Sequence, residues 1–228
     1  MSIDSQIAAA RAAIAGHDGV IRGRRKPRMG KPGGRGSLFF SVKNRGFIPV
    51  RSRLQRLYCF LLEEDPEIVL YRTDAIEIRT GNQIQIPTFL VWKTNGVVSI
   101  REIVSTRSLA SPNVARKFKA LSVAASSLDI PFEGISEKEI RSRVDLDLMI
   151  STYNRGGKRY GREVVGEYVL EFSKLIPQTE FTVGRFRSLL TENSLPCGYL
   201  EAAIFHRLIS LRGSAGLDAD TMLEVRRA

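Results

Sequence analysis

The sequence predicts an α/β domain followed by a smaller, mainly helical C-terminal domain. Its patterns run helix, three or four strands, helix, strand and helix, which is not a series of alternating βαβ units. Beyond residue 153 the patterns are helical and little else. A chain of 228 residues, 43% of them hydrophobic, can bury a substantial core in one large domain or two small ones.

The first elements expected are an Ala-rich helix over residues 3–16 and a strongly basic segment after it. Gly and Pro alternate with cations in this segment, which predicts an extended arm that is poorly ordered alone. Such an arm can neutralise phosphates without reading bases, or it can be a solvated tail or dock on a protein. The candidate DNA-binding residues are Arg22, Arg24, Arg25, Lys26, Arg28 and Lys31, followed by Lys43 and Arg45.

The central elements follow from apolar periodicity and turn residues. Residues 37–50 are expected in short extended pieces, and helical spacing predicts a helix over 52–64 that ends at Asp65-Pro66. Alternating and β-branched runs predict strands at 68–73, 75–80, 83–92 and 97–105. Turns are expected at Thr80-Gly81-Asn82 and at residues 93–96, so that 82–104 forms a hairpin.

The later elements are a helix over 113–127, a strand over 129–136 and a helix over 137–152. Three further helical patterns cover 162–175, 182–193 and 197–212. Their short connections suit a helix-turn-helix or winged-helix unit, although a plain three-helix bundle fits the pattern equally. The expected domains are the helix and arm at 1–36, the α/β domain at 37–153 and the helical domain at 154–228.

A net charge of +11 favours a polyanionic partner such as nucleic acid over a basic protein with no such partner. No apolar run approaches the roughly 20 residues of a membrane span, and the N-terminus lacks a signal-peptide pattern. Cys59 and Cys197 form no CxxC or Cys/His cluster, which favours a reducing cytoplasm and gives no sign of zinc.

Several motifs occur in a specific order between residues 35 and 145. The run from Ser41 to Leu54 has the spacing S-x-K-N followed by S-x-L, and Asp65-Pro66 comes after it. The blocks PTFLV at 87–91 and EIV at 102–104 follow, and then FEGISEKEIR at 132–141. In this order they resemble the TnsA family, the endonuclease subunit of heteromeric bacterial transposases.

The resemblance implies a restriction-endonuclease-like, PD-(D/E)XK core, in which a mixed sheet is flanked by helices. It also implies a winged-helix C-terminal domain that contacts the transposase and an AAA+ regulator, and residues 155–228 would take that place. Active members of the family use Mg²⁺ to cut DNA at transposon 5′ ends. The expected location is the bacterial cytoplasm, with no membrane association.

The family's four functional positions fall on Gln55, Thr88, Glu102 and Val104. Glu102 alone keeps the family's chemistry, since two carboxylates and the lysine are replaced. Mg²⁺ requires hard oxygen ligands, and general acid–base help is worth roughly 10² to 10⁴ in rate. We therefore expect a DNA-binding, catalytically degenerate subunit that needs no cofactor. It would act as a scaffold with transposon ends, the transposase and the AAA+ ATPase.

Two alternatives remain open from the sequence. One is an active metal-dependent endonuclease with a rearranged site, for which Asp74 and Glu77 are the only acids able to migrate. Arg101 points to the other face of the strand from Glu102 and is a poor substitute for the lysine. The other is a restriction-fold protein used outside transposition. In a degenerate site Glu102 is expected to be half-buried and paired with a base such as Arg53 or Arg72.

Overall fold

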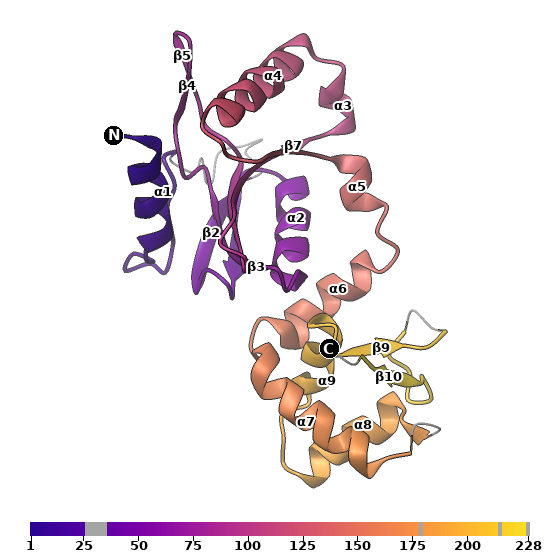
Figure 1. Cartoon of the computed structure of the whole chain (residues 1–228). Helices are drawn as coiled ribbons and strands as arrows, with labels where there is room; N and C mark the ends of the chain where they lie inside the picture. The colour runs from indigo at the N-terminus through magenta and orange to yellow at the C-terminus, as the bar shows by residue number, and fades with distance from the viewer. Residues whose placement is uncertain (26–35, 178–179, 214–215, 227–228) are drawn as a thin grey trace. The chain divides into compact units, whose positions relative to one another are not determined.

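The computed structural model describes residues 1–25, 36–177, 180–213 and 216–226 (Figure 1). The chain divides into two compact units, residues 1–143 and residues 144–228. The sequence placed this division further along the chain, after residue 153. The expected α/β class is confirmed, with a mixed sheet in the first unit and a mostly helical second unit.

The first unit is built on a four-stranded sheet in the order β3-β6-β7-β8. Neighbours β3, β6 and β7 are antiparallel, whereas β8 runs parallel to β7 with Glu102 beside Gly134. The predicted hairpin is therefore present as β6 and β7. The strands are β3 (Ile68–Thr73), β6 (Phe89–Lys93), β7 (Val98–Val104) and β8 (Phe132–Ser136).

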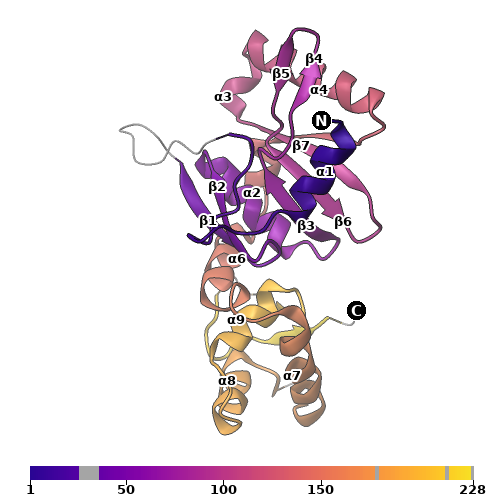
Figure 2. The ribbon, with the colours of Figure 1, turned by 90° about the vertical axis from the view of Figure 1, so that its left-hand side faces the viewer.

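Helices lie on both faces of this sheet. On one face α1 (Ile3–Ala12) and α4 (Pro112–Ser127) pack on Leu90, Trp92 and Ile100. On the other face α2 (Arg53–Glu64) places Tyr58 edge-on against Phe89, with ring centroids 5.4 Å apart. Figures 1 and 2 show α1 and α2 on opposite sides of the strands. Side chains that alternate along each strand therefore face two separate environments, one beneath α1 and α4 and the other beneath α2.

Two hairpins lie outside the main sheet. Residues 37–50, expected in short extended pieces, form the antiparallel pair β1 (Ser37–Ser41) and β2 (Gly46–Val50). The turn expected at Thr80–Asn82 joins β4 (Ile78–Thr80) to β5 (Gln83–Gln85). The expected strand over 83–92 is split between β5 and β6, where Pro87 has no N–H for a ladder.

Several expected elements are shorter than their apolar patterns suggested. The first helix ends at Ala12 instead of residue 16. The helix expected over 137–152 is two helices, α5 (Glu137–Arg141) and α6 (Leu146–Thr152), and α6 belongs to the second unit. A short helix, α3 (Thr106–Leu109), precedes α4. Apolar spacing continues across such breaks, so it does not mark them.

The second unit surrounds a core that includes Phe172, Phe186 and Leu200. The strands β9 and β10 are antiparallel, and Thr182 forms an isolated bridge to Met222. The elements are α6, the π-helix η1 (Tyr153–Gly157), α7 (Arg162–Leu175), α8 (Val183–Glu192), α9 (Gly198–Phe205), β9 (Ile209–Leu211) and β10 (Leu223–Val225).

The helix expected over 197–212 is wrong in its second half. Arg207 has a left-handed φ of 57°. Its N–H donates to the Ile204 carbonyl and the Leu208 N–H donates to the Ala203 carbonyl. These two bonds end the helix in a Schellman motif, in which glycine is the usual left-handed residue. Residues 209–211 then become a strand.

Helix α9 is buried along nearly its whole length. The chain at η1 approaches it so closely that a Cβ on Gly156 would lie 2.1 Å from the Gly198 carbonyl oxygen. Tyr153 adds an aromatic contact to Phe205 at 5.0 Å between ring centroids. The second helix of the α8–α9 pair is therefore covered by its own chain.

Candidate functional site

Glu102 lies in the second half of β7 and is only 4% exposed. Its Oε2 accepts the Thr88 backbone N–H at 2.8 Å, and its Oε1 accepts a hydrogen bond from the Lys117 ammonium on α4. The expected partners, Arg53 or Arg72, are wrong. Arg72 is directed instead at the Ala10 carbonyl at 3.0 Å. A buried carboxylate is therefore neutralised by a cation of the same unit.

Asp74 follows the end of β3 and lies close to Glu102. Its N–H donates to the Thr88 carbonyl at 3.1 Å, so Thr88 contacts both acids through its backbone. The Asp74 carboxylate accepts from Arg51 Nη2 at 2.7 Å. Burial raises the pKa of Asp74, Arg51 and Arg25 oppose that shift, and the negative charge of Glu102 adds to it. Asp74, named above as a possible migrant, thus joins the site.

Unlike Asp74, Gln55 and Val104 form no hydrogen bond with Glu102 or Thr88 among the described residues. Gln55 lies in the first turn of α2, where its Oε1 accepts the Arg51 N–H at 2.7 Å. It is linked to Asp74 only through Arg51. Val104 is 6% exposed and lies two residues from Glu102 on the same face of β7. An aliphatic side chain at this point neither binds phosphate nor carries a proton.

Sequence reasoning missed Lys117, although a signal was present. Lys117, Leu121 and Ala125 recur at intervals of four, and the latter two are fully buried. A lysine in line with a buried stripe of a helix faces the core and requires an anionic partner. Arg101 behaves as expected: its Nη1 donates to the Tyr58 hydroxyl at 2.9 Å, on the α2 face and away from Glu102.

The two carboxylates of this site that a divalent ion could use are both paired with cations in the structure. Among the described residues no group of three or more His, Cys, Asp and Glu side chains could hold a metal. Mg²⁺ is normally bound through one or two carboxylates together with substrate phosphates. Here Glu102 is already bonded to Lys117 and Asp74 to Arg51. Glu77, the other proposed migrant, is exposed, and its backbone is bound by the Gln6 side chain.

The described part of the basic segment is docked on the first unit and is not a free arm. Arg24 donates its N–H to the Asp74 carbonyl at 2.7 Å. Gly23 crosses so closely that a Cβ there would lie 2.3 Å from the Thr73 carbonyl oxygen. The described part of the segment therefore ends beside the carboxylate cluster, which consists of Asp74 and Glu102. The positive charge of Arg25 acts on Asp74. Lys26, Arg28 and Lys31 lie outside the described residues.

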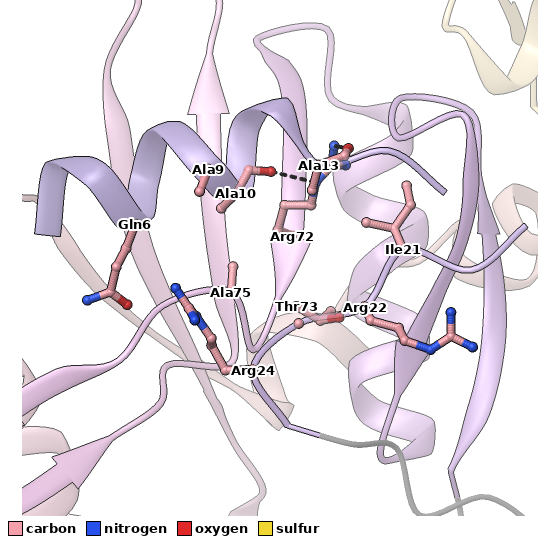
Figure 3. A pocket seen from close by; sticks show the side chains of 11 residues that line it. Gln6, Ala9, Ala10, Ala13, Ile21, Arg22, Arg24, Arg72, Thr73 and Ala75 are labelled. Carbon is pink, nitrogen blue, oxygen red and sulfur yellow. Dashed lines mark hydrogen bonds between the residues drawn. The ribbon is translucent and has the colours of Figure 1, made fainter. Parts of the chain in front are cut away.

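A small cavity of about 310 Å³ separates this segment from α1 (Figure 3). Figure 3 shows Arg24 extending toward α1, whereas Arg22 points away from it. Arg22 forms an exposed ion pair with Asp18. Four of the eleven residues that line the cavity are alanines and three are arginines.

Lys43, expected to bind DNA, directs its charge into the fold. Its Nζ donates to the Leu62 carbonyl at 2.7 Å and to that of Asp65, at the C-terminal end of α2. Burial lowers the pKa of Lys43 to about 8, against the opposing effect of Glu63. Ser41 also bonds to Glu63. The S-x-K-N motif therefore holds the β1–β2 turn to α2, while Arg45 in that turn is exposed.

No described helix is long and apolar enough to cross a lipid bilayer. No protein-family model matches this chain, and comparison with curated proteins finds no match.

Proposed function

We propose that this chain is a DNA-binding protein with a degenerate nuclease site. In this proposal it is a TnsA-like subunit that acts as a scaffold with a transposase and an AAA+ regulator. The observation that carries the proposal is the contact between Glu102 and Lys117. It joins the retained, buried acid of the hairpin to the partly buried ammonium group of Lys117, at bonding distance.

The electrostatics of the site favour binding over cleavage. Hydrolysis on such a scaffold needs a metal to polarise the phosphate and to acidify the attacking water. Both buried carboxylates are instead paired with cations, and Val104 stands where the family has its lysine. A positive side chain at the same place still attracts phosphate, because the charge of Arg25 acts at Asp74.

The architecture of the first unit supports the restriction-endonuclease-like assignment. That assignment calls for a mixed sheet flanked by helices. Here α2 leads into β3, the hairpin β6–β7 carries the retained acid, and α4 lies between β7 and the parallel strand β8. The net charge of +11 supports a DNA partner for this unit.

The second unit supports a winged-helix assignment better than a plain three-helix bundle. The α8–α9 pair is followed by the β9–β10 hairpin, and the bridge from Thr182 to Met222 adds a third extended segment. Because α9 is covered by η1, it is not free to enter a DNA groove. In our proposal this unit contacts the transposase and the regulator.

The test uses the protein, its cognate transposase and DNA carrying the transposon ends, with Mg²⁺ or Mn²⁺ present. We expect binding without nicking. A variant restored at three positions, Gln55→Glu, Thr88→Asp and Val104→Lys, should nick, and adding Glu102→Gln to it should abolish that activity. Nicking by the unaltered protein that Glu102→Gln removes would contradict the proposal.

One observation favours the alternative of an active endonuclease with a rearranged site. Asp74 and Glu102 interact electrostatically, and Lys117 lies with them, so two acids and a lysine share one place. If this were a working site, both Asp74→Asn and Glu102→Gln would abolish metal-dependent nicking. Arg51→Gln, which frees Asp74 from its cation, would then increase it.

A further inference from the structure

A second basic surface lies at the far end of the sheet from Glu102. An open cleft of about 560 Å³ is bordered by the C-terminal end of α1, the β1–β2 turn and the end of β6. Trp92 and Lys93 line it at the end of β6 opposite to Thr88. Five strand steps separate Thr88 from Lys93, which corresponds to about 17 Å. The cleft is therefore separate from the carboxylate cluster.

The charged groups that line this cleft are all cations. They are Arg11, Lys43, Arg45, Arg72 and Lys93, and no described Asp or Glu lines it. Two of them are engaged within the fold, since Arg72 donates to the Ala10 and Ala13 carbonyls and Lys43 to the end of α2. The remaining three come from three different elements.

Arg11, Arg45 and Lys93 have no side-chain hydrogen bond or ion pair within the described part of the chain. Arg45 is also held at a left-handed φ of 53° by the turn bond from its N–H to the Val42 carbonyl at 3.0 Å. Neighbouring Asn44 is fixed by Arg72. The turn thus fixes the backbone of one free cation beside two others, and a bound anion would reduce the repulsion among the three charges.

The size and chemistry of the cleft fit a chain of phosphates. Its volume exceeds what a single phosphate needs and lies within the roughly 300 to 1,000 Å³ of typical ligand sites. Guanidinium groups form forked hydrogen bonds to phosphate oxygens, and two of the three free cations are arginines. We propose that this cleft binds the phosphodiester backbone of DNA, as a second contact surface apart from the hairpin site. The inference rests on the proposed function, because it presupposes a DNA-binding chain.

The test compares two triple variants of the full chain that lose the same charge. The cleft variant is Arg11→Gln/Arg45→Gln/Lys93→Gln. The control is Arg79→Gln/Lys119→Gln/Lys138→Gln, whose three cations are exposed and lie outside the cleft. Affinity for a duplex of about 30 base pairs is measured by fluorescence anisotropy over a range of salt concentrations. Each phosphate contact contributes about 0.9 to the slope of log K against log salt.

We expect the cleft variant to lower that slope by about 2 to 3, and the control to lower it by less than about 1. Equal effects of the two variants, or none, overturn the inference while leaving the proposed function intact. If the unaltered chain shows no salt-dependent DNA binding, both the cleft inference and the proposed function are refuted. Loss of poly-glutamate binding in the cleft variant with unchanged DNA binding would make the cleft an acidic-peptide site and would also overturn it. Lys93→Gln alone, expected to lower the slope by about 1, covers the case of a poorly folded triple variant.

Discussion

Replacing Lys117 with methionine tests whether Glu102 is held by an internal cation. The change keeps much of the side-chain length but leaves a carboxylate that is 4% exposed without its charge partner. Breaking a buried ion pair costs about 3–5 kcal/mol when one charge is left alone. The Lys117 side chain is 26% exposed and the Thr88 N–H still bonds to Glu102, so a smaller loss of about 2 kcal/mol is expected.

Trp92 makes this loss measurable. It is the single tryptophan of the chain and is buried in the first unit, so its fluorescence during urea unfolding reports on that unit. With a urea dependence of roughly 1–3 kcal/mol per M, the midpoint should fall by about 1 M. The matched control is Lys119→Met, the same change at an exposed position two residues along α4. It should move the midpoint little.

A double-mutant cycle completes this prediction. Glu102→Gln combined with Lys117→Met removes both charges, so the double variant should be less destabilised than the two single changes added together. The expected coupling is about 1–2 kcal/mol. Additive effects would refute the claim that Lys117 neutralises Glu102. A Lys117→Met variant no less stable than Lys119→Met would refute it as well.

Three other properties of the molecule can be tested in the same way. Gly23→Ala should destabilise the first unit by about 1–3 kcal/mol in urea, because its Cβ would meet the Thr73 carbonyl. Gly161→Ala has open space for its Cβ but removes the glycine N-cap of α7, so it should cost the second unit about 0.5–1 kcal/mol and leave the first unit unchanged. Burial lowers the pKa of Lys43 to about 8 in the folded chain, against 10.5 when unfolded. The cost of burying its charge is therefore full below pH 8 and is relieved as the pH rises toward 10.5. Over that range the thermal midpoint of the unaltered protein should rise relative to that of Lys43→Met. Ser194 ends α8 with φ 55°, and Ser194→Gly should raise the stability of the second unit by about 0.5–1 kcal/mol in thermal unfolding followed by circular dichroism.

Local sequence patterns account for the elements that were predicted well. The helix over 52–64 has a stop signal at Asp65-Pro66 and was found at Arg53–Glu64. The hairpin of β6 and β7 has turn residues between two apolar strands. In both cases the information lies within a few residues of the element itself.

A helix end without glycine explains one error, at the end of α9, whereas the helices expected over 113–127 and 182–193 end close to where they were expected. Asp129, Ser194 and Arg207 each adopt a left-handed φ just past a helix, and none carries the usual glycine signal. The prediction therefore extended this helix past Phe205 to residue 212. The apolar spacing of Leu208 and Leu211 matches a helix as well as a short strand.

The candidate site was only partly predictable for a different reason. The positions of Thr88 and Glu102 on one hairpin follow from their order in the chain. The partner of Glu102 comes from α4, through the packing of that helix on the sheet. The four-residue spacing of Lys117, Leu121 and Ala125 marks the face that α4 buries, but no local motif tells which strand residue that face meets.

Nicking of supercoiled plasmid by the unaltered protein tests the central claim most directly. The protein is added at a concentration that saturates DNA binding in a parallel anisotropy titration, with Mg²⁺ and then Mn²⁺. Because Glu102 and Asp74 are paired with Lys117 and Arg51, we predict saturated binding and no nicked product above a protein-free control. Metal-dependent nicking that disappears in Glu102→Gln would contradict the account.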